Sequence, residues 1–312
     1  MITARQLVRR FGDHEAVAGV DLDVAAGEIY GFLGPNGAGK TTTVRMLCTL
    51  LSITSGQATV AGRDVATEPG QVRLRIGVAL QEASLDPKQS GRELLHLHAR
   101  LYGLSKSAAT RRVTELEQLV DIGDALDRRI GGYSGGMRRR LDLAASLLHE
   151  PTILFLDEPT TGLDPVSRAA VWDEVRRLNT EFGMTIFLTT QYLEEADELA
   201  HRVGIINGGR IVAEGTPTDL KRRVGADVVV ATVSGDTAAA CSALRHLDGV
   251  SSVEQHGDEI TIAVDNGPAL LSPVAVALSE QNVTVIGLTL RTPTLDDVFL
   301  DVTGNRMKAT NA

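Results

Sequence analysis

The chain has 312 residues, a length from which about two domains are expected. Hydrophobic residues make up 43% and charged residues 23%, a composition that excludes overall disorder and allows a sizeable core. Aspartate and glutamate (40) outnumber lysine and arginine (31), and the net charge of −9 argues against a broad nucleic-acid-binding surface.

Membrane insertion and secretion are not expected from the sequence. No apolar run approaches the roughly 18 residues of a transmembrane helix, and no signal-peptide core follows the N-terminal residues. The two cysteines, Cys48 and Cys241, are far apart and predict reduced thiols instead of a disulfide framework. We therefore expect the chain to stay in the cytoplasm unless a partner holds it at a membrane.

The negative charge is concentrated near the C-terminus. Eleven acidic and four basic residues follow Gly225, so this segment carries −7 of the total charge of −9. The change in composition at residues 222–225 predicts a domain boundary. We expect a first domain over residues 1–224, a smaller domain over 225–303 and a tail over 304–312.

Strands and helices alternate in the first domain. Buried strands are predicted over 29–33, 153–156 and 185–188, and helices over 42–51 and 165–182. Asp164 and Pro165 give the last helix a capping residue and a favourable first position. Such alternation is typical of an α/β fold with a mostly parallel sheet covered on both faces. Residues 88–150 lack strand signals and predict a helical subdomain.

The C-terminal segment has a different order of elements. Strands are predicted over 228–233, 250–255, 259–264 and 283–290, and helices over 237–247, 270–281 and 294–302. Before the closing helix, the order β-α-β-β-α-β is typical of a small ferredoxin-like α+β domain.

A phosphate-binding loop follows the first buried strand. The pattern G-x-x-x-x-G-K-[ST] is formed by Gly34, Pro35, Asn36, Gly37, Ala38, Gly39, Lys40 and Thr41, and Thr42 follows in the predicted helix. Glycines let the backbone curl so that several N–H groups point inward, and the helix N-terminus adds a partial positive charge. Lys40 would reach the β- and γ-phosphates, and the Thr41 hydroxyl would face Mg²⁺.

Two carboxylates end the second buried strand. Asp157 would bind Mg²⁺, and Glu158 would act as general base on the attacking water. Two acids at the start of a solvated loop are common, but their pairing with the phosphate loop favours a nucleotide-hydrolysing site. A guanine-reading Asn-Lys-x-Asp is absent from the sequence, so ATP is the expected nucleotide.

A third motif gives the family resemblance. Ser134, Gly135 and Gly136 precede a helix expected to start near Met137, which would create a second anion site. Together with the phosphate loop, this segment resembles the ATP-binding subunits of ABC transporters, whose signature is Leu-Ser-Gly-Gly-Gln. The resemblance implies that Ser134, Gly135 and Gly136 cap the γ-phosphate held by a second copy of the chain.

Other positions match the same family in order. Gln81 corresponds to the loop that contacts Mg²⁺ and reports to the membrane subunit, and Asp164 to the loop that crosses the dimer interface. Gln191 corresponds to the switch position, where most members have histidine. Phe11 stands where the family places an aromatic ring stacked on adenine, although a lone phenylalanine is as readily explained as a core residue.

Departures from the family pattern narrow the resemblance. Tyr133 and Met137 flank the signature, Gln191 replaces histidine, and the segment 295–300 reads Leu-Asp-Asp-Val-Phe-Leu. These features resemble the daunorubicin/doxorubicin-resistance type. That resemblance implies an ATPase that uses ATP and Mg²⁺, pairs with a second copy, and drives drug, antibiotic or lipid efflux through a separate polytopic permease at the cytoplasmic face of the membrane.

Two other classes remain open from the sequence alone. One is an ABC-type ATPase without a permease that acts on DNA or ribosomes; such proteins usually carry tandem ATPase units, coiled-coil arms or zinc cysteines. The other is a sensor that uses the C-terminal segment as a ligand domain. The single ATPase unit and the two scattered cysteines favour the transporter.

Overall fold

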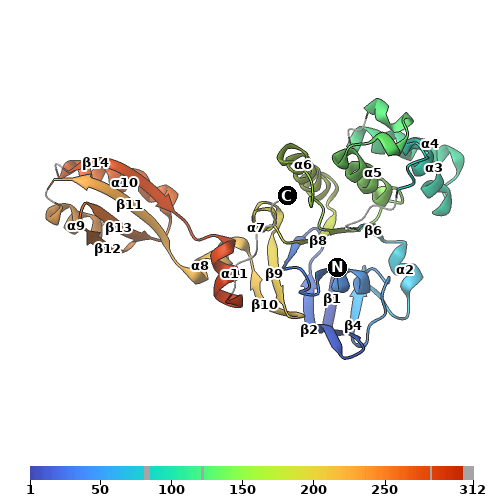
Figure 1. The fold of residues 1–312 in the computed structure, drawn as a ribbon, viewed down its shortest axis with the longest axis horizontal. Helices are drawn as coiled ribbons and strands as arrows, with labels where there is room; N and C mark the ends of the chain where they lie inside the picture. Colours follow the sequence, from blue (N-terminus) through green and yellow to red (C-terminus); the bar gives the residue numbers. More distant parts are fainter. Residues whose placement is uncertain (81–84, 121–122, 236, 282, 305–312) are drawn as a thin grey trace. The chain divides into compact units, whose positions relative to one another are not determined.

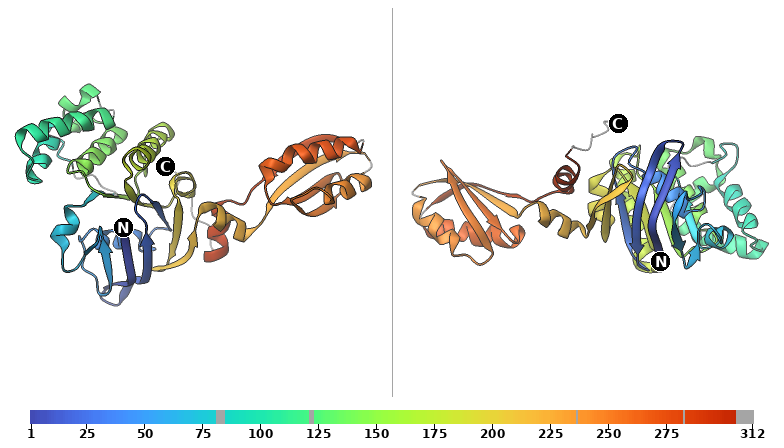
Figure 2. Two further views of the ribbon diagram at one scale, coloured as in Figure 1. Left: turned by 180° about the vertical axis from the view of Figure 1, so that it is seen from behind. Right: turned by 90° about the horizontal axis from the view of Figure 1, so that it is seen from below.

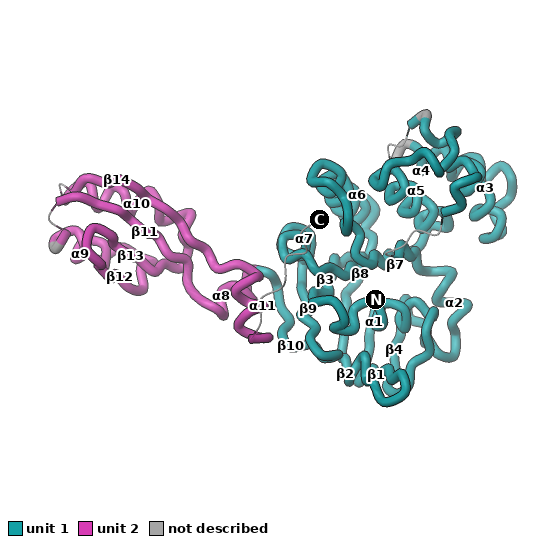
Figure 3. The backbone as a smooth tube through the Cα atoms, in the orientation of Figure 1, with its two compact units in different colours: residues 1–217, 306–312 teal, residues 218–305 magenta. Residues whose placement is uncertain are grey.

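The computed structural model describes residues 1–80, 85–120, 123–235, 237–281 and 283–304. The chain forms two compact units, which divide between Pro217 and Thr218 (Figure 3). The domain boundary predicted from the change in composition lies between residues 224 and 225, at the C-terminal end of α8 (Pro217–Val224). In the structure, nearly all of this helix is grouped with the second unit.

Two sheets build the first unit (Figure 1). The larger has the order β10-β9-β3-β8-β7-β6, in which only the edge strand β10 is antiparallel. Its strands are β3 (Ile29–Leu33), β6 (Ile76–Ala79), β7 (Ile153–Asp157), β8 (Thr185–Thr190), β9 (Arg202–Asn207) and β10 (Arg210–Gly215). The smaller sheet is antiparallel, with β1 (Ile2–Phe11), β2 (His14–Val24), β4 (Ser55–Val60) and β5 (Arg63–Asp64).

Both faces of the central strands are buried, as a continuous apolar strand requires. Along β7, Phe155 packs in a cluster with β1, β2 and helix α1 (Lys40–Leu47), whereas Leu154 and Leu156 pack in a second cluster with helices. Phe187 and Ile186 of β8 divide between the two clusters in the same way. The prediction of a mostly parallel sheet covered on both faces is therefore confirmed. The antiparallel sheet of the first unit, formed by β1, β2, β4 and β5, was not predicted.

Helices α6 (Pro165–Phe182) and α7 (Leu193–Leu199) contribute to the second cluster, and the short helix α2 (Pro69–Arg73) precedes β6. The predicted bounds of β3 and α6 are confirmed, including Asp164 as N-cap. The predicted helix 42–51 is wrong at both ends. It starts at Lys40 because Gly39 adopts a left-handed conformation directly before it, and it ends at Leu47 before Thr49 turns to φ 62°.

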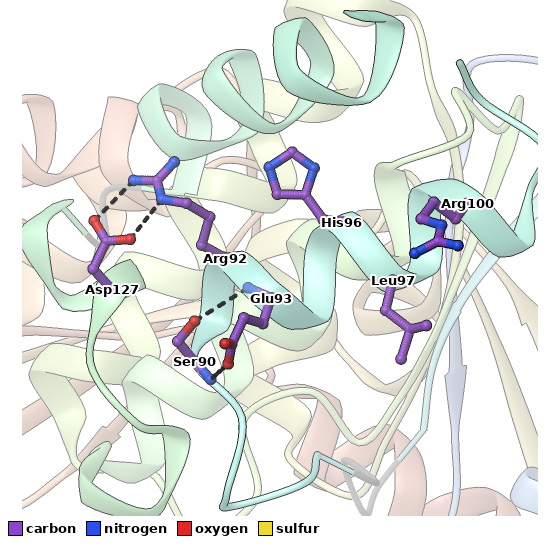
Figure 4. Close-up of a pocket in the computed structure, with 7 residues that line it drawn as sticks. All are labelled: Ser90, Arg92, Glu93, His96, Leu97, Arg100 and Asp127. Carbon is purple, nitrogen blue, oxygen red and sulfur yellow. Dashed lines mark hydrogen bonds and ion pairs between the residues drawn. The ribbon is translucent and has the colours of Figure 1, made fainter. Parts of the chain in front are cut away.

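A helical region lies between β6 and β7, as predicted (Figure 2). It contains α3 (Gly91–Leu101), α4 (Lys106–Val120), α5 (Gly135–Leu147) and two short 3₁₀ turns, Gly123–Asp127 and Ile130–Gly132. Figure 4 shows how α3 begins: Ser90 and Glu93 form a capping box, and Arg92 pairs with Asp127 of the first 3₁₀ turn at 2.6 Å. These contacts fix the first turn of α3 to the segment before α5.

The second unit has the predicted β-α-β-β-α-β order. Its antiparallel sheet, β12-β13-β11-β14, is formed by β11 (Asp227–Ser234), β12 (Val250–His256), β13 (Glu259–Val264) and β14 (Thr284–Arg291). Helices α9 (Ala238–Arg245) and α10 (Gly267–Glu280) pack on it in one apolar cluster, and α11 (Leu295–Thr303) follows. The ferredoxin-like fold is confirmed. No helix among the described residues of either unit is long and apolar enough to cross a membrane.

A largely buried ion pair lies within α5, and its arginine also bonds the residue that follows β6. The Arg139 guanidinium donates to the Leu80 carbonyl at 2.7 Å and lies 3.4 Å from Asp142, and both side chains are largely buried. Burial raises the pKa of Asp142 from 3.8 to about 6, although Arg139 acts in the opposite direction. An acid whose pKa is raised on folding contributes its full stabilisation at pH values below its ordinary pKa, here 3.8. It loses this contribution as the pH rises through the pKa in the folded protein, here about 6.

We therefore predict that Asp142→Asn becomes more stable relative to the unmodified protein as the pH rises from 4 to 7. The difference in unfolding free energy should change by up to roughly 3 kcal/mol, measured by denaturant titration. Asp173→Asn serves as control because Asp173 is an exposed acid on α6. A stability difference for Asp142→Asn that is constant over this pH range would contradict the prediction.

Candidate nucleotide-binding site

Strand register brings the predicted site residues to one edge of the parallel sheet. Leu33 at the end of β3 pairs with Thr190 of β8, and Asp157 at the end of β7 pairs with Thr189. The phosphate loop, the two acids and the switch position Gln191 each follow one of these strand ends. Ligands of open α/β sheets bind outside the carboxyl ends of strands, so this edge is the candidate site.

The phosphate loop has close approaches that only glycine permits. A Cβ atom on Gly34 would lie 2.5 Å from the Ile206 carbonyl oxygen, and one on Gly39 would lie 2.5 Å from that of Ala16. Gly37 and Gly39 also have φ values of 81° and 109°. Gly39 caps α1 without a side-chain hydrogen bond, so the N–H groups of the first turn, Lys40 to Thr42, are available to an anion.

Lys40 lies over this loop in a buried ion pair. Its ammonium donates to the carbonyl of Gly34 at 2.8 Å and to that of Pro35 at 3.2 Å. It also lies 3.2 Å from Glu158 Oε1, and the side chains are only 4% and 5% exposed. Each charge depends on the other at this depth, because an unpaired buried charge is strongly destabilising. The arrangement places a cation directly beside the loop.

Asp157 has the surroundings of a cation ligand. Its Oδ1 accepts from Thr189 Oγ1 at 2.5 Å and from Thr41 Oγ1 at 3.2 Å. Its Oδ2 is buried without a hydrogen-bond partner. Because a buried carboxylate oxygen without a partner is costly, and because carboxylate and hydroxyl oxygens are the ligands that Mg²⁺ prefers, these two residues fit a magnesium ion.

Glu158 is held in a conformation that is rare outside glycine. Its φ is 49°, and its backbone N–H donates to both the carbonyl and the hydroxyl of Thr189, at 3.1 and 3.0 Å. Its Oε2 accepts from Thr161 Oγ1 at 3.3 Å. A strained backbone conformation of this kind is kept only where surrounding contacts enforce it. Such residues are common at functional sites. The contacts aim the carboxylate toward Lys40.

Ser134, Gly135 and Gly136 begin α5, which starts at Gly135 and not near Met137 as predicted. The Ser134 hydroxyl caps this helix by accepting from the Met137 N–H at 3.2 Å. Asp164 caps α6 in the same manner, accepting from Ser167 N–H at 3.0 Å. None of the hydrogen bonds described for Ser134 and Asp164 reaches the phosphate loop, so the structure does not join this group to Lys40 within one chain.

The remaining predicted residues differ in their surroundings. Phe11 ends β1 with 47% of its surface exposed, so its interpretation as a core residue is wrong, and the Arg9 guanidinium covers its ring at 4.6 Å. Gln191 is half-buried directly after β8. Gln81 lies outside the described residues. The adenine, switch and metal roles of these three residues stay predictions.

Thr189 was missed by the sequence analysis. It supports both Asp157 and Glu158, although its position at the end of an apolar strand gives only a weak signal. The feature that points to this residue is a pair of adjacent threonines at the carboxyl end of a buried strand, facing a strand that ends in acids. The role of Thr189 depends on strand pairing, which the sequence does not reveal.

Comparison with known proteins agrees with this geometry. Residues 17–161 match the family described as ABC transporter. The ATP-binding subunit of an ABC transporter has a similar structure, with a TM-score of 0.65 and 27% identity over 72% of this chain and 92% of that one. A dimeric bacterial ABC transporter cassette aligns with a TM-score of 0.63 over 69% of this chain and 98% of that one, at 23% identity. The chain is an ATP-binding, ATP-hydrolysing protein of the ABC transporter class.

Similarity over the whole chain identifies the family within this class. Residues 215–303 match the C-terminal domain of DrrA1-3-like ATP-binding proteins. The daunorubicin resistance ATP-binding protein DrrA2 of Streptomyces coeruleorubidus is 47% identical over 100% of this chain and 97% of its own length. The linearmycin resistance ATP-binding protein LnrL of Bacillus subtilis is 36% identical over 99% and 100%. The chain belongs to the daunorubicin-resistance family of ABC ATP-binding proteins.

Gly39 provides a test of the loop geometry. Gly39→Ala should weaken ATP binding by at least about tenfold, because the new Cβ meets the Ala16 carbonyl at 2.5 Å and the φ of 109° disfavours alanine. Gly37→Ala is the matched control, since Gly37 also has a positive φ but no atom within 4 Å of a Cβ. Titration with a fluorescent ATP analogue would measure both. Equal affinities for the two variants would count against the steric argument.

Proposed function

We propose that the chain powers efflux of a drug, antibiotic or lipid-like compound through a separate polytopic permease at the cytoplasmic face of the membrane. The similarity of the whole chain to resistance ATP-binding proteins supports this function, because it includes the C-terminal unit as well as the ATPase unit. The alternative of an ATPase acting on DNA or ribosomes does not account for the match of residues 215–303.

Within one chain, the residues divide the work of binding and hydrolysis. The loop amides and Lys40 hold the phosphates, and Thr41, Asp157 and Gln81 would hold Mg²⁺, which neutralises phosphate charge when bound. Glu158 accepts the proton of the attacking water, and Gln191 hydrogen-bonds the γ-phosphate. The cluster of Lys40, Asp157 and Glu158 at the end of the parallel sheet carries this assignment.

A second copy of the chain would complete the site. Ser134, Gly135 and Gly136 lie at the start of α5, where backbone N–H groups and the helix dipole favour an anion. Among the residues that the structure describes, the Ser134 side chain bonds only the first turn of its own helix, so this group would be able to face a γ-phosphate bound to a partner chain. Asp164, at the start of α6, would lie at the same interface. ATP would then favour the closed dimer because it contacts both chains only in that state.

Glu158→Gln tests this composite site. The variant should bind ATP with little loss, because the amide keeps the size of the side chain and the bound phosphates supply the negative charge that Lys40 loses, but its hydrolysis should fall by about a hundredfold or more. ATP should then hold it as a dimer, measured by light scattering coupled to size exclusion. A Glu158→Gln protein that stays monomeric with saturating ATP at high concentration would contradict the composite site.

Drug efflux is tested in cells that express the chain together with its permease. Daunorubicin accumulation, followed by its own fluorescence, should be lower than in cells with the permease alone. Glu158→Gln should abolish the difference because ATP hydrolysis drives the transport. Unchanged accumulation with an active ATPase, repeated with an apolar antibiotic and a fluorescent lipid, would exclude the proposed efflux function while leaving the ATPase assignment intact.

A further inference from the structure

Glu195 of α7 is a completely buried acid that has no part in the site described above. Its Oε1 accepts from Thr160 Oγ1 at 2.9 Å and from Trp172 Nε1 at 3.0 Å. The Thr190 hydroxyl donates to the Tyr192 carbonyl at 3.4 Å, and it also acts on the Glu195 carboxyl by lowering its pKa. One side chain of α7 therefore gathers donors from the β7–α6 loop and from α6.

The positions of Thr160 and Thr190 relate Glu195 to the proposed catalytic residues. Thr160 lies two residues after Glu158 on the same loop, and it is fully buried. Thr190 immediately precedes Gln191, and its carbonyl accepts from the N–H of Gly34 at 3.3 Å. Glu195 itself lies four residues after Gln191, so its bond to Thr160 links the segment of the switch residue to the loop of the proposed base.

The energetic cost of burying Glu195 indicates that this residue does more than fill space in the core. Its second oxygen, Oε2, is buried without a hydrogen-bond partner, which an apolar side chain of similar volume would avoid. Burial raises the pKa of Glu195, and Arg168 acts on it through charge without forming an ion pair. What the carboxyl supplies here is an acceptor that two donors share.

We propose that Glu195 is a positioning residue for ATP hydrolysis. By holding Thr160 from its place on α7, which follows Gln191, it sets the distance between the loop of Glu158 and that of Gln191. The inference rests on the proposed roles of these two residues. It requires the acceptor oxygen at the Oε1 position and not the negative charge, because Thr160 and Trp172 both donate hydrogen bonds to it.

Steady-state kinetics of paired variants test the proposal. Glu195→Ala should lower kcat by about 10- to 100-fold, as expected for a small misplacement of reacting groups, with little change in the KM for ATP. Glu195→Gln keeps an acceptor oxygen and should retain kcat within about threefold. Thr160→Val, which removes one donor, should lower kcat in the same direction as Glu195→Ala.

Glu28 is a matched control for burial of an acid. It is 8% exposed, accepts from the Ala25 N–H at 2.7 Å and pairs with Arg202 at 3.3 Å, at the opposite end of β3 from the phosphate loop. Glu28→Ala should lower the melting temperature without changing kcat at temperatures where the protein is folded. A purely structural role for Glu195 would make the two alanine variants behave alike.

Trp172 supplies a signal that does not depend on activity. It is the single tryptophan of the chain, so its emission reports on the contact with Glu195. Glu195→Ala should shift the emission maximum, whereas Glu195→Gln should preserve it. Where Glu195→Ala fails to fold, Thr160→Val and Trp172→Phe still test the network through kcat.

The outcomes separate this proposal from the proposed function. Normal kcat in folded Glu195→Ala would overturn the positioning role, as would loss of kcat in Glu195→Gln with unchanged emission, because charge would then be required. If instead Glu158→Gln hydrolyses ATP normally, the assignment of Glu158 as the base is wrong. Any effect of the Glu195 variants on kcat must then act through a residue other than Glu158. The fluorescence result would stand in either case.

Discussion

The parallel register of β3, β7 and β8 is the constraint on which the site depends. Each strand alternates between two buried clusters, with Phe155 and Phe187 on one side and Leu154 and Ile186 on the other. A slip of one residue would exchange the sides of every side chain, and both clusters would lose their packing. Core packing therefore fixes where the strands end and, with them, where Lys40 and the two acids stand.

This placement explains how polar groups whose burial costs free energy can be buried at the sheet edge. Lys40 and Glu158 are stable there only as a pair, and Asp157 keeps one oxygen without a partner. Thr189 holds the backbone of Glu158 and one oxygen of Asp157, so the two acids cannot move independently. Apolar packing supplies the stability that allows this small polar cluster to be arranged for chemistry.

The parts of the fold that were predictable carry local signals. β3 ends in a glycine-rich loop, and α6 begins with Asp164 and Pro165, so their bounds could be predicted from neighbouring residues. The antiparallel sheet was missed because β1 lacks regular alternation: its pairing with β2 shifts between Ala4 and Leu7. Contiguous motifs revealed most of the site in the same way. Thr189 and Glu195 act through contacts with distant segments, which a linear pattern does not contain.

The proposed site has residues that act within one chain, such as Glu158, and residues that would face a partner chain, such as Ser134. These two groups place different demands on the structure. In the first, the proposed base Glu158 and the proposed switch residue Gln191 would have to keep a fixed separation, which contacts within one chain can provide through Thr160 and Glu195. In the second, Ser134 would approach the phosphates only when a partner arrives, which a helix that caps itself permits. Rigidity within a chain and closure between chains are therefore separable in the proposed dimer. A partner chain would need to supply only anion-binding groups, because contacts within one chain already hold the backbone of the proposed base Glu158.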